Sequence, residues 1–156
     1  MAQYGWTFMF VDADPVSGQE SFSYTIGFEK TYSHPEVIIF GLPAEASHRI
    51  VSVIAAAIKE SEIMPLHVAV DNIIGNDLKV IFKPLDHLLY ADYLSVAIEA
   101  YGTKNFRSQI MLWPDTKGNY PFDTNYCIKA QLSATKAISA SDKFEVPALG
   151  SLSKLH

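Results

Sequence analysis

Cysteine is almost absent from this sequence, and its scarcity excludes several classes of protein. Cys127 is the only cysteine among 156 residues, which rules out an intramolecular disulfide and disfavours a cysteine-based zinc site. A single unpaired thiol is typical of a reducing compartment. Residues 1–6 also lack the basic start and apolar stretch of a signal peptide. We therefore expect a cytoplasmic protein.

Arginine is scarce as well. Arg49 and Arg107 are the only two, and no run of basic residues accompanies them. With 12 basic and 17 acidic side chains, the net charge is −5. Nucleic-acid binding depends on Lys and Arg clustered around phosphates, so we expect no nucleic-acid partner. No apolar run reaches the ~20 residues that span a bilayer, so we expect no membrane partner either.

Familiar catalytic and cofactor motifs are missing. The sequence contains neither GxGxxG nor GxxxxGK[ST], the glycine-rich loops that hold phosphates. It also lacks HExxH and GxSxG, and no close pair of carboxylates stands out. His48 would complete a three-ligand metal set with His34 and Glu36, although nothing in the spacing requires it. We predict no metal and no cofactor, and the sequence leaves open whether the protein is an enzyme.

The composition that remains is that of one globular domain. Apolar residues make up 49% of the chain and charged residues 19%. A chain of this length buries roughly 70% of the surface that its unfolded form exposes, so it needs no metal or disulfide to fold. We predict a single domain over residues 1–132. Residues 133–156 are rich in small side chains and are typical of a partly disordered C-terminal segment.

Apolar patterns predict the elements of the first half. Residues 6–11 and 22–28 flank a turn-rich segment and predict a hairpin. We interpret residues 29–35 as a polar connection. Residues 36–42 (EVIIFGL) form a nearly continuous apolar run, which predicts a central strand buried on both faces. Helical spacing of apolar residues then predicts a helix over residues 44–60.

The second half completes an α+β fold. Residues 78–85 alternate between apolar and polar, which predicts a strand with one exposed face. A second helix is predicted to begin at a cap, Asp86 or Asp92, and to end at Gly102. Residues 109–113 predict the last strand. The expected architecture is a mainly antiparallel sheet of five or six strands with two helices packed on it.

Four candidate ligand-binding residues cluster around the second and third strands. Tyr24 and Thr25 precede Gly27, where the missing side chain admits a ligand or another backbone; a strand bend is the alternative interpretation. The proline between His34 and Glu36 favours an extended backbone, which directs both side chains to one side. They would form an acid/base or ligand pair. Alternatively, His34 ends a loop and Glu36 caps or pairs with a neighbour.

Two further candidates follow the last strand. Trp113 would supply a flat apolar wall and Asp115 a polar group at a loop edge, an arrangement common in ligand clefts. In the alternative interpretation, Trp113 belongs to the core and Asp115 binds the amides of its own turn. Cys127 has no base beside it in the sequence, so we interpret it as a buried structural thiol.

The chain resembles a bacterial family known only as domain of unknown function 4262. The resemblance covers about residues 6–122, and its motifs are fairly specific when they occur together in this order and spacing. It is carried by FSYTIGF at 22–28, HPE at 34–36 running into IFGL at 39–42, the helix after Pro43, QIMLWPD at 109–115, Gly118 and Pro121. The chain departs from the family pattern at Phe122, where Trp is common, and at Gln131-Leu132, where a Gln-Pro step is common. The resemblance implies a small bacterial cytoplasmic protein and brings no catalytic residue.

Three functional hypotheses follow. The leading one is a non-catalytic module that binds a small molecule or a protein through Tyr24, Thr25, His34, Glu36, Trp113 and Asp115. The second is a small hydrolase that uses His34 and Glu36 with Asp115. The third is a flavin-binding split barrel, which the strand-rich first half permits although no phosphate-gripping arginine cluster supports it. The sequence does not indicate an oligomeric state.

Overall fold

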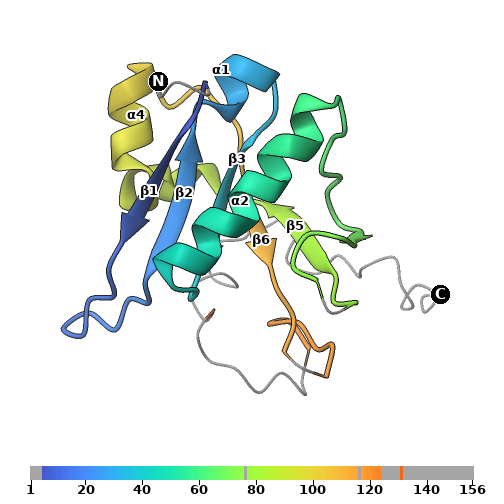
Figure 1. Ribbon diagram of the computed structural model, residues 1–156. Helices are drawn as coiled ribbons and strands as arrows, with labels where there is room; N and C mark the ends of the chain where they lie inside the picture. Colours follow the sequence, from blue (N-terminus) through green and yellow to red (C-terminus); the bar gives the residue numbers. More distant parts are fainter. Residues whose placement is uncertain (1–4, 76, 116, 124–130, 132–156) are drawn as a thin grey trace.

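A computed structural model describes residues 5–75, 77–115, 117–123 and 131. Its centre is a six-stranded sheet with the strand order β1-β2-β3-β6-β5-β4 (Figure 1). The strands are β1 (Thr7–Val11), β2 (Phe22–Ile26), β3 (Glu36–Phe40), β4 (Ala69–Val70), β5 (Val80–Pro84) and β6 (Ser108–Leu112). Neighbouring strands are antiparallel except β3 and β6, which are parallel. The expected single α+β domain with a mainly antiparallel sheet is confirmed.

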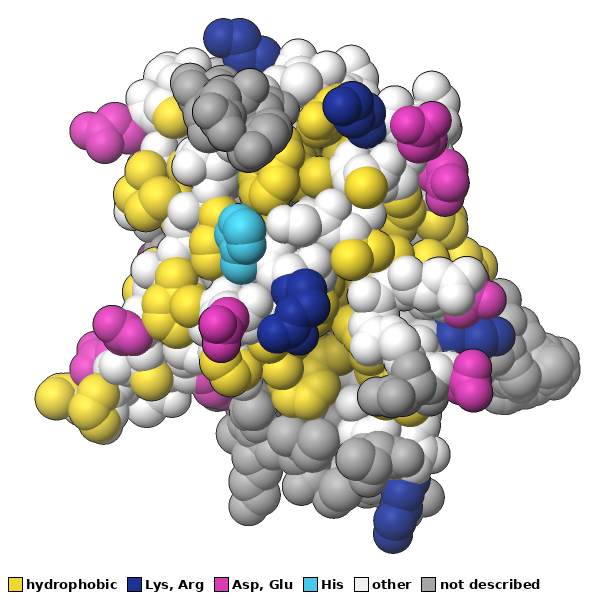
Figure 2. Space-filling model, in the orientation of Figure 1, with side chains coloured by type: hydrophobic (Ala, Val, Ile, Leu, Met, Phe, Trp, Pro, Cys, Tyr) yellow, Lys and Arg dark blue, Asp and Glu magenta, His cyan; other side chains and the backbone are white. Residues whose placement is uncertain are grey.

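Helices cover both faces of this sheet. They are α1 (Phe28–Tyr32), α2 (Ala44–Lys59), the 3-10 helix η1 (His87–Leu89), α3 (Tyr90–Tyr93) and α4 (Ser95–Tyr101). The long helix α2 lies across one face, and α3 and α4 lie on the other (Figure 1). On the α2 side, hydrophobic side chains lie scattered between charged ones at the surface (Figure 2).

Two hydrophobic clusters, one on each face, form the core. Successive side chains of a strand point to opposite faces, so Val37 and Ile39 of β3 pack with α2 while Ile38 and Phe40 pack with α3 and α4. All four side chains are fully buried. The prediction that this continuous apolar run is a central strand buried on both faces is confirmed.

The prediction that one face of residues 78–85 is exposed holds at Lys79, just before β5, but was wrong within β5. Ile81 is fully buried and Lys83 is only 1% exposed. They lie on the face that α3 and α4 cover, because Ile81 belongs to the cluster of that face. The Lys83 ammonium lies 3.0 Å from Nδ1 of His67. The Phe122 ring centroid also lies 6.0 Å from the ammonium, so residues distant in the sequence surround this lysine.

The second helix is interrupted, which the sequence did not predict. Asp86 does act as a cap, because its carboxylate accepts a hydrogen bond from the backbone N–H of Leu88, but it caps η1. The chain breaks helical geometry at Leu94 (φ −112°, ψ 33°), whose side chain is fully buried. Helix α4 then ends at Gly102 in the left-handed conformation, as expected.

The segment over residues 29–35 is also more ordered than expected. Strand β2 ends at Ile26, and α1 occupies most of the segment that we interpreted as a polar connection. The predicted tail at residues 133–156 and the thiol of Cys127 lie outside the described residues. Within the described ranges, no helix has both the length and the apolar character to cross a membrane.

Candidate functional site

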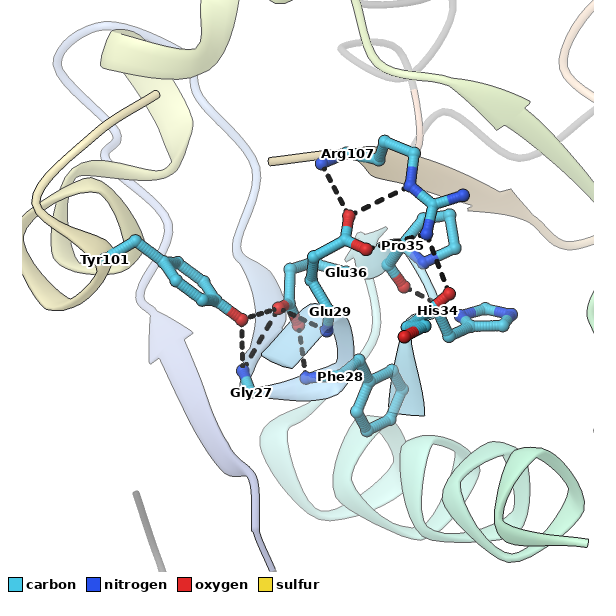
Figure 3. A network of polar contacts seen from close by, with 9 residues as sticks. Gly27, Phe28, Glu29, His34, Pro35, Glu36, Tyr101 and Arg107 are labelled. Carbon is cyan, nitrogen blue, oxygen red and sulfur yellow. Dashed lines mark hydrogen bonds and ion pairs between the residues drawn. The ribbon is translucent and has the colours of Figure 1, made fainter. Parts of the chain in front are cut away.

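The carboxylate of Glu36 is the anchor of a buried polar network at the start of β3. Its side chain is fully buried, and both of its oxygens accept several hydrogen bonds (Figure 3). The donors are the Thr25 hydroxyl at 2.7 Å, the backbone N–H groups of Gly27, Phe28 and Glu29 at 3.1 Å each, and the Tyr101 hydroxyl. Glu36 thereby satisfies the first amides of α1, which an isolated helix of this length leaves unpaired.

This environment fixes the protonation chemistry of the network. Burial raises the pKa of Glu36, and the hydrogen bonds from Tyr101, the Glu29 amide and Thr25 oppose that rise. Burial and the adjacent carboxylate raise the pKa of Tyr101, so its hydroxyl stays protonated and donates. Because five donors occupy the carboxylate, Glu36 is not a free base for a substrate.

His34 is held as a neutral structural residue. It is 3% exposed, and its Nε2 accepts a hydrogen bond from the Met64 backbone N–H at 3.2 Å. Nδ1 therefore carries the proton and donates to the Pro35 carbonyl at 2.8 Å. Burial lowers the pKa of His34 below its ordinary value. Since both ring nitrogens are occupied within the protein, neither is available for proton transfer in this conformation.

The six candidate residues do not form one cleft. Thr25 and Glu36 are in direct contact, whereas Tyr24 points to the opposite face, where its hydroxyl accepts a hydrogen bond from the Val96 N–H. Glu36 pairs with Ser108 at the start of β6, and Asp115 stands seven positions after Ser108. At about 3.3 Å per strand residue, that separation is on the order of 20 Å.

The arrangement at Asp115 is a turn. One oxygen of its carboxylate accepts hydrogen bonds from the backbone N–H groups of Lys117 and Asn119, both at 2.9 Å. Such bonds are typical of aspartates that stabilise their own loop. The structure thus does not bring His34, Glu36 and Asp115 together, and the proposed hydrolase constellation is not assembled.

Trp113 faces an apolar groove. Its indole N–H donates to the Phe40 carbonyl at 2.9 Å, which fixes the ring beside the ends of the parallel strands β3 and β6. The groove has a volume of about 290 Å³, and it is lined almost entirely by apolar side chains of α2 and the neighbouring loops. Arg49 is the one charged residue on its wall.

A larger concavity, which we call the polar cavity, lies at the opposite end of β6 and was not found from the sequence. Its volume is about 720 Å³. The polar side chains that line it are Glu29, His87, Tyr90, Asn105, Arg107, Ser108 and Gln109. Its apolar walls are formed by Pro35, Leu66, Pro84, Leu85 and Phe106. Ligand sites commonly combine such apolar walls with a few convergent polar groups.

A bidentate ion pair borders the polar cavity (Figure 3). Arg107 donates from Nε to Glu29 at 2.9 Å and from Nη2 at 2.6 Å, and its backbone N–H adds a third bond at 3.0 Å. Nη2 also donates to the carbonyl of Ser33, at the end of α1. The hydrogen bonds from Arg107 lower the pKa of Glu29 and keep it ionised. The guanidinium therefore ties α1 to the start of β6 while its side chain stays 60% exposed.

Two buried polar groups at the polar cavity lack partners. Within the described ranges, the Ser108 hydroxyl and the Gln109 amide nitrogen make no hydrogen bond, although Ser108 is only 5% exposed and Gln109 only 2%. Leaving such a group unsatisfied costs about 1–3 kcal/mol. Ser23 and Ser47 also have unpartnered hydroxyls but do not line the polar cavity. Ser108 and Gln109 are consecutive on β6, so their side chains point to opposite faces of the sheet.

Sequence signals for the polar cavity exist, but they are faint. Arg107 is one of two arginines, and Gln109 is a polar residue at the start of a buried strand. Glu29 and Arg107 are 78 positions apart, so no local spacing connects them.

In the parts of the chain that the structure describes, no cluster of three or more His, Cys, Asp or Glu side chains could hold a metal ion.

The comparison with known families supports the resemblance seen in the sequence. Residues 1–127 match the family described as Domain of unknown function (DUF4262). The chain belongs to this family. No curated protein and no solved structure matches it significantly. DUF4262 membership assigns no activity.

Proposed function

We propose that this DUF4262 protein is a non-catalytic binding module that holds a small molecule in the polar cavity. The observation that carries the proposal is a concavity of about 720 Å³ in which apolar walls meet the fixed ion pair of Glu29 and Arg107. Pockets for small molecules usually measure about 300–1,000 Å³. The Arg107 side chain is 60% exposed, so its guanidinium remains accessible to a ligand.

The fixed frame around the polar cavity supports binding. Glu29 is held by Arg107, and α1 is capped at one end by Glu36 and held at the other through Ser33. A wall built in this way loses little conformational entropy when a ligand binds, which favours affinity. The occupied nitrogens of His34 and the saturated carboxylate of Glu36 favour a structural role for both residues over an acid/base role.

Fragment screening by NMR tests the proposal. We expect library members to shift the backbone amides of residues 105–109 in a saturable way, and Arg107→Gln to weaken their binding. Arg49→Gln is the matched control, because Arg49 is the other arginine of the chain and lines a different groove. Fragments that bind elsewhere only, or that bind Arg107→Gln and Arg49→Gln equally well, would overturn the proposal. Capture of a protein partner through this surface without any small ligand would do so too.

We also propose that the protein works in the bacterial cytoplasm and binds no nucleic acid. The single cysteine among 156 residues and the net charge of −5 support this setting. Cell fractionation of a bacterium that carries the gene would test the location, and recovery in the membrane or secreted fraction would contradict it. The open sheet, with β1 and β4 at its edges, gives no support to the split-barrel alternative.

A further inference from the structure

We propose that β1 pairs with β1 of a second copy of this chain, so that two sheets join edge to edge in a reversible dimer. β1 forms one edge of the sheet, and its described neighbour in the sheet is β2 (Figure 1). None of the residues that line the polar cavity belongs to β1. The contact is therefore separate from the proposed ligand site, and each can be tested without the other.

Hydrogen bonds between β2 and β3 fix the directions of the main-chain groups in β2. The Gly41 N–H donates to the Ser21 carbonyl at 2.8 Å, at the end of the ladder that joins these strands. Main-chain groups of successive strand residues point to alternate sides, so odd-numbered residues of β2 bond toward β3 and even-numbered residues toward β1. Tyr24 pairs with Met9, so the main-chain groups of Met9 point into the sheet, toward β2.

The N–H and C=O groups of Phe8 and Phe10 consequently point away from the sheet. No hydrogen bond from the described part of the chain reaches them from outside β1 and β2. β1 also has no charged residue and no proline, which are common means of protecting an edge strand from pairing. The opposite edge, β4, is protected by its length of only two residues.

A second copy of β1 matches this edge when the two strands run antiparallel about a two-fold axis at Met9. Phe8 then lies opposite Phe10 of the partner subunit, and symmetry repeats the pair. Each pair exchanges two main-chain hydrogen bonds. Phe8 packs beside the α2 cluster, and Phe10 lies on the same face because side chains alternate along a strand. Both rings are only half-buried, so they are available for the aromatic cross-strand pairs that stabilise sheets.

The other face of β1 is equally compatible with a second copy. In the same register, the two Met9 side chains meet at the axis, and Thr7 lies opposite Val11 of the partner subunit. Val11 is 37% exposed, so pairing shields apolar surface, and no like charges meet. Standard interfaces involve about 20–30 residues a side, whereas β1 has five. The dimer is therefore expected to be reversible, with an affinity in the micromolar range or weaker.

Sedimentation equilibrium of the full chain tests this pairing. We expect the average mass to rise from monomer toward dimer between micromolar and millimolar concentration. Thr7→Lys combined with Val11→Lys places two like-charged pairs across the axis, which should weaken dimerisation about tenfold. This is expected although both lysines lower the net negative charge of each copy. Thr7→Lys combined with Val11→Glu is the matched control, because it places opposite charges at the same positions and should dimerise more tightly than the double-lysine variant.

A main-chain variant tests the outward N–H group directly. Phe10→Pro removes this donor without removing a hydrogen bond to β2, and proline is tolerated at such edge positions. It should abolish the dimer, whereas Phe10→Val keeps the N–H and should dimerise. Circular dichroism checks that the variants fold.

Three outcomes would overturn the proposal. One is a wild-type protein that stays monomeric up to millimolar concentration. Another is equal dimerisation of the double-lysine and lysine–glutamate variants, which would mean that the copies do not meet through β1 in this register. The third is pairing of β1 with an extended peptide of another protein while the chain itself stays monomeric.

Discussion

The Tyr101 hydroxyl donates a hydrogen bond to the buried carboxylate of Glu36 across 65 positions of sequence. The same hydroxyl accepts a hydrogen bond from the Gly27 N–H at 3.1 Å, which also reaches Glu36. Tyr101 ends α4, Glu36 begins β3 and Gly27 caps α1. One carboxylate therefore joins three elements, and its charge is buried only because every side of it meets a donor.

Glu36→Gln should destabilise the protein by about 2–4 kcal/mol. The substituted amide keeps the shape of the side chain but replaces one acceptor oxygen by a donor, which must then face backbone N–H groups of α1. Urea unfolding measures the change. Glu99→Gln removes the same charge at an exposed position of α4 and should change the free energy of unfolding by no more than about 0.5 kcal/mol. Equal effects of the two variants would contradict a capping role for Glu36.

Tyr101→Phe and Thr25→Val should each cost about 1–3 kcal/mol, because each removes a donor to a buried carboxylate. The double variant is the informative one. The two hydroxyls donate to different oxygens of the same Glu36 carboxylate, so their effects should couple through it and fail to add. A double-mutant cycle by urea unfolding measures this. Strict additivity would show that the network does not act as a unit.

Local sequence patterns predicted the elements that have a clear apolar periodicity or a continuous apolar run. The helix over 44–60 and the central strand at 36–42 follow from periodicity and continuous apolar character. Helix α1 does not, because five residues cannot form a stable helix alone. Its caps come from Glu36 and Arg107, which lie after it in the chain, and Arg107 lies far from it. The sequence therefore showed polar residues where the fold has a helix.

At the candidate site, too, the sequence predicted residues within local motifs but not contacts between distant segments. Sequence reasoning singled out Thr25, His34 and Glu36, and the structure gives each of them a buried polar contact. It did not find the polar cavity, because Glu29 and Arg107 meet only after α1 packs against the start of β6. The exposed face predicted for β5 failed for a related reason, since the side chains that contact Lys83, His67 and Phe122, lie far from it in the chain.

Stability should fall as the pH drops below 6.5, and His34 should account for part of the loss. Burial lowers the pKa of His34 from its ordinary 6.5. Between that value and the lowered one, the unfolded chain binds a proton that the folded protein does not, so the free energy of unfolding decreases as pH falls. Urea unfolding between pH 8 and pH 5 measures this slope.

The variants make the assignment to His34 specific. His34→Gln should flatten the slope between pH 7 and pH 5, while His48→Gln, at an exposed position of α2, should leave it unchanged. An NMR titration of the imidazole in the folded protein gives the pKa directly. A His34 resonance that titrates at or above 6.5 would contradict the buried, neutral ring and the hydrogen bond from Met64.

Gln109→Leu should stabilise the protein. The substitution replaces an unpartnered amide, 2% exposed, with an apolar side chain of similar size. Removing an unsatisfied buried donor is worth about 1 kcal/mol, which in a chain of this size raises Tm by about 2–4 °C. Differential scanning calorimetry measures the shift. A lower Tm for Gln109→Leu would mean that the amide has a structural partner.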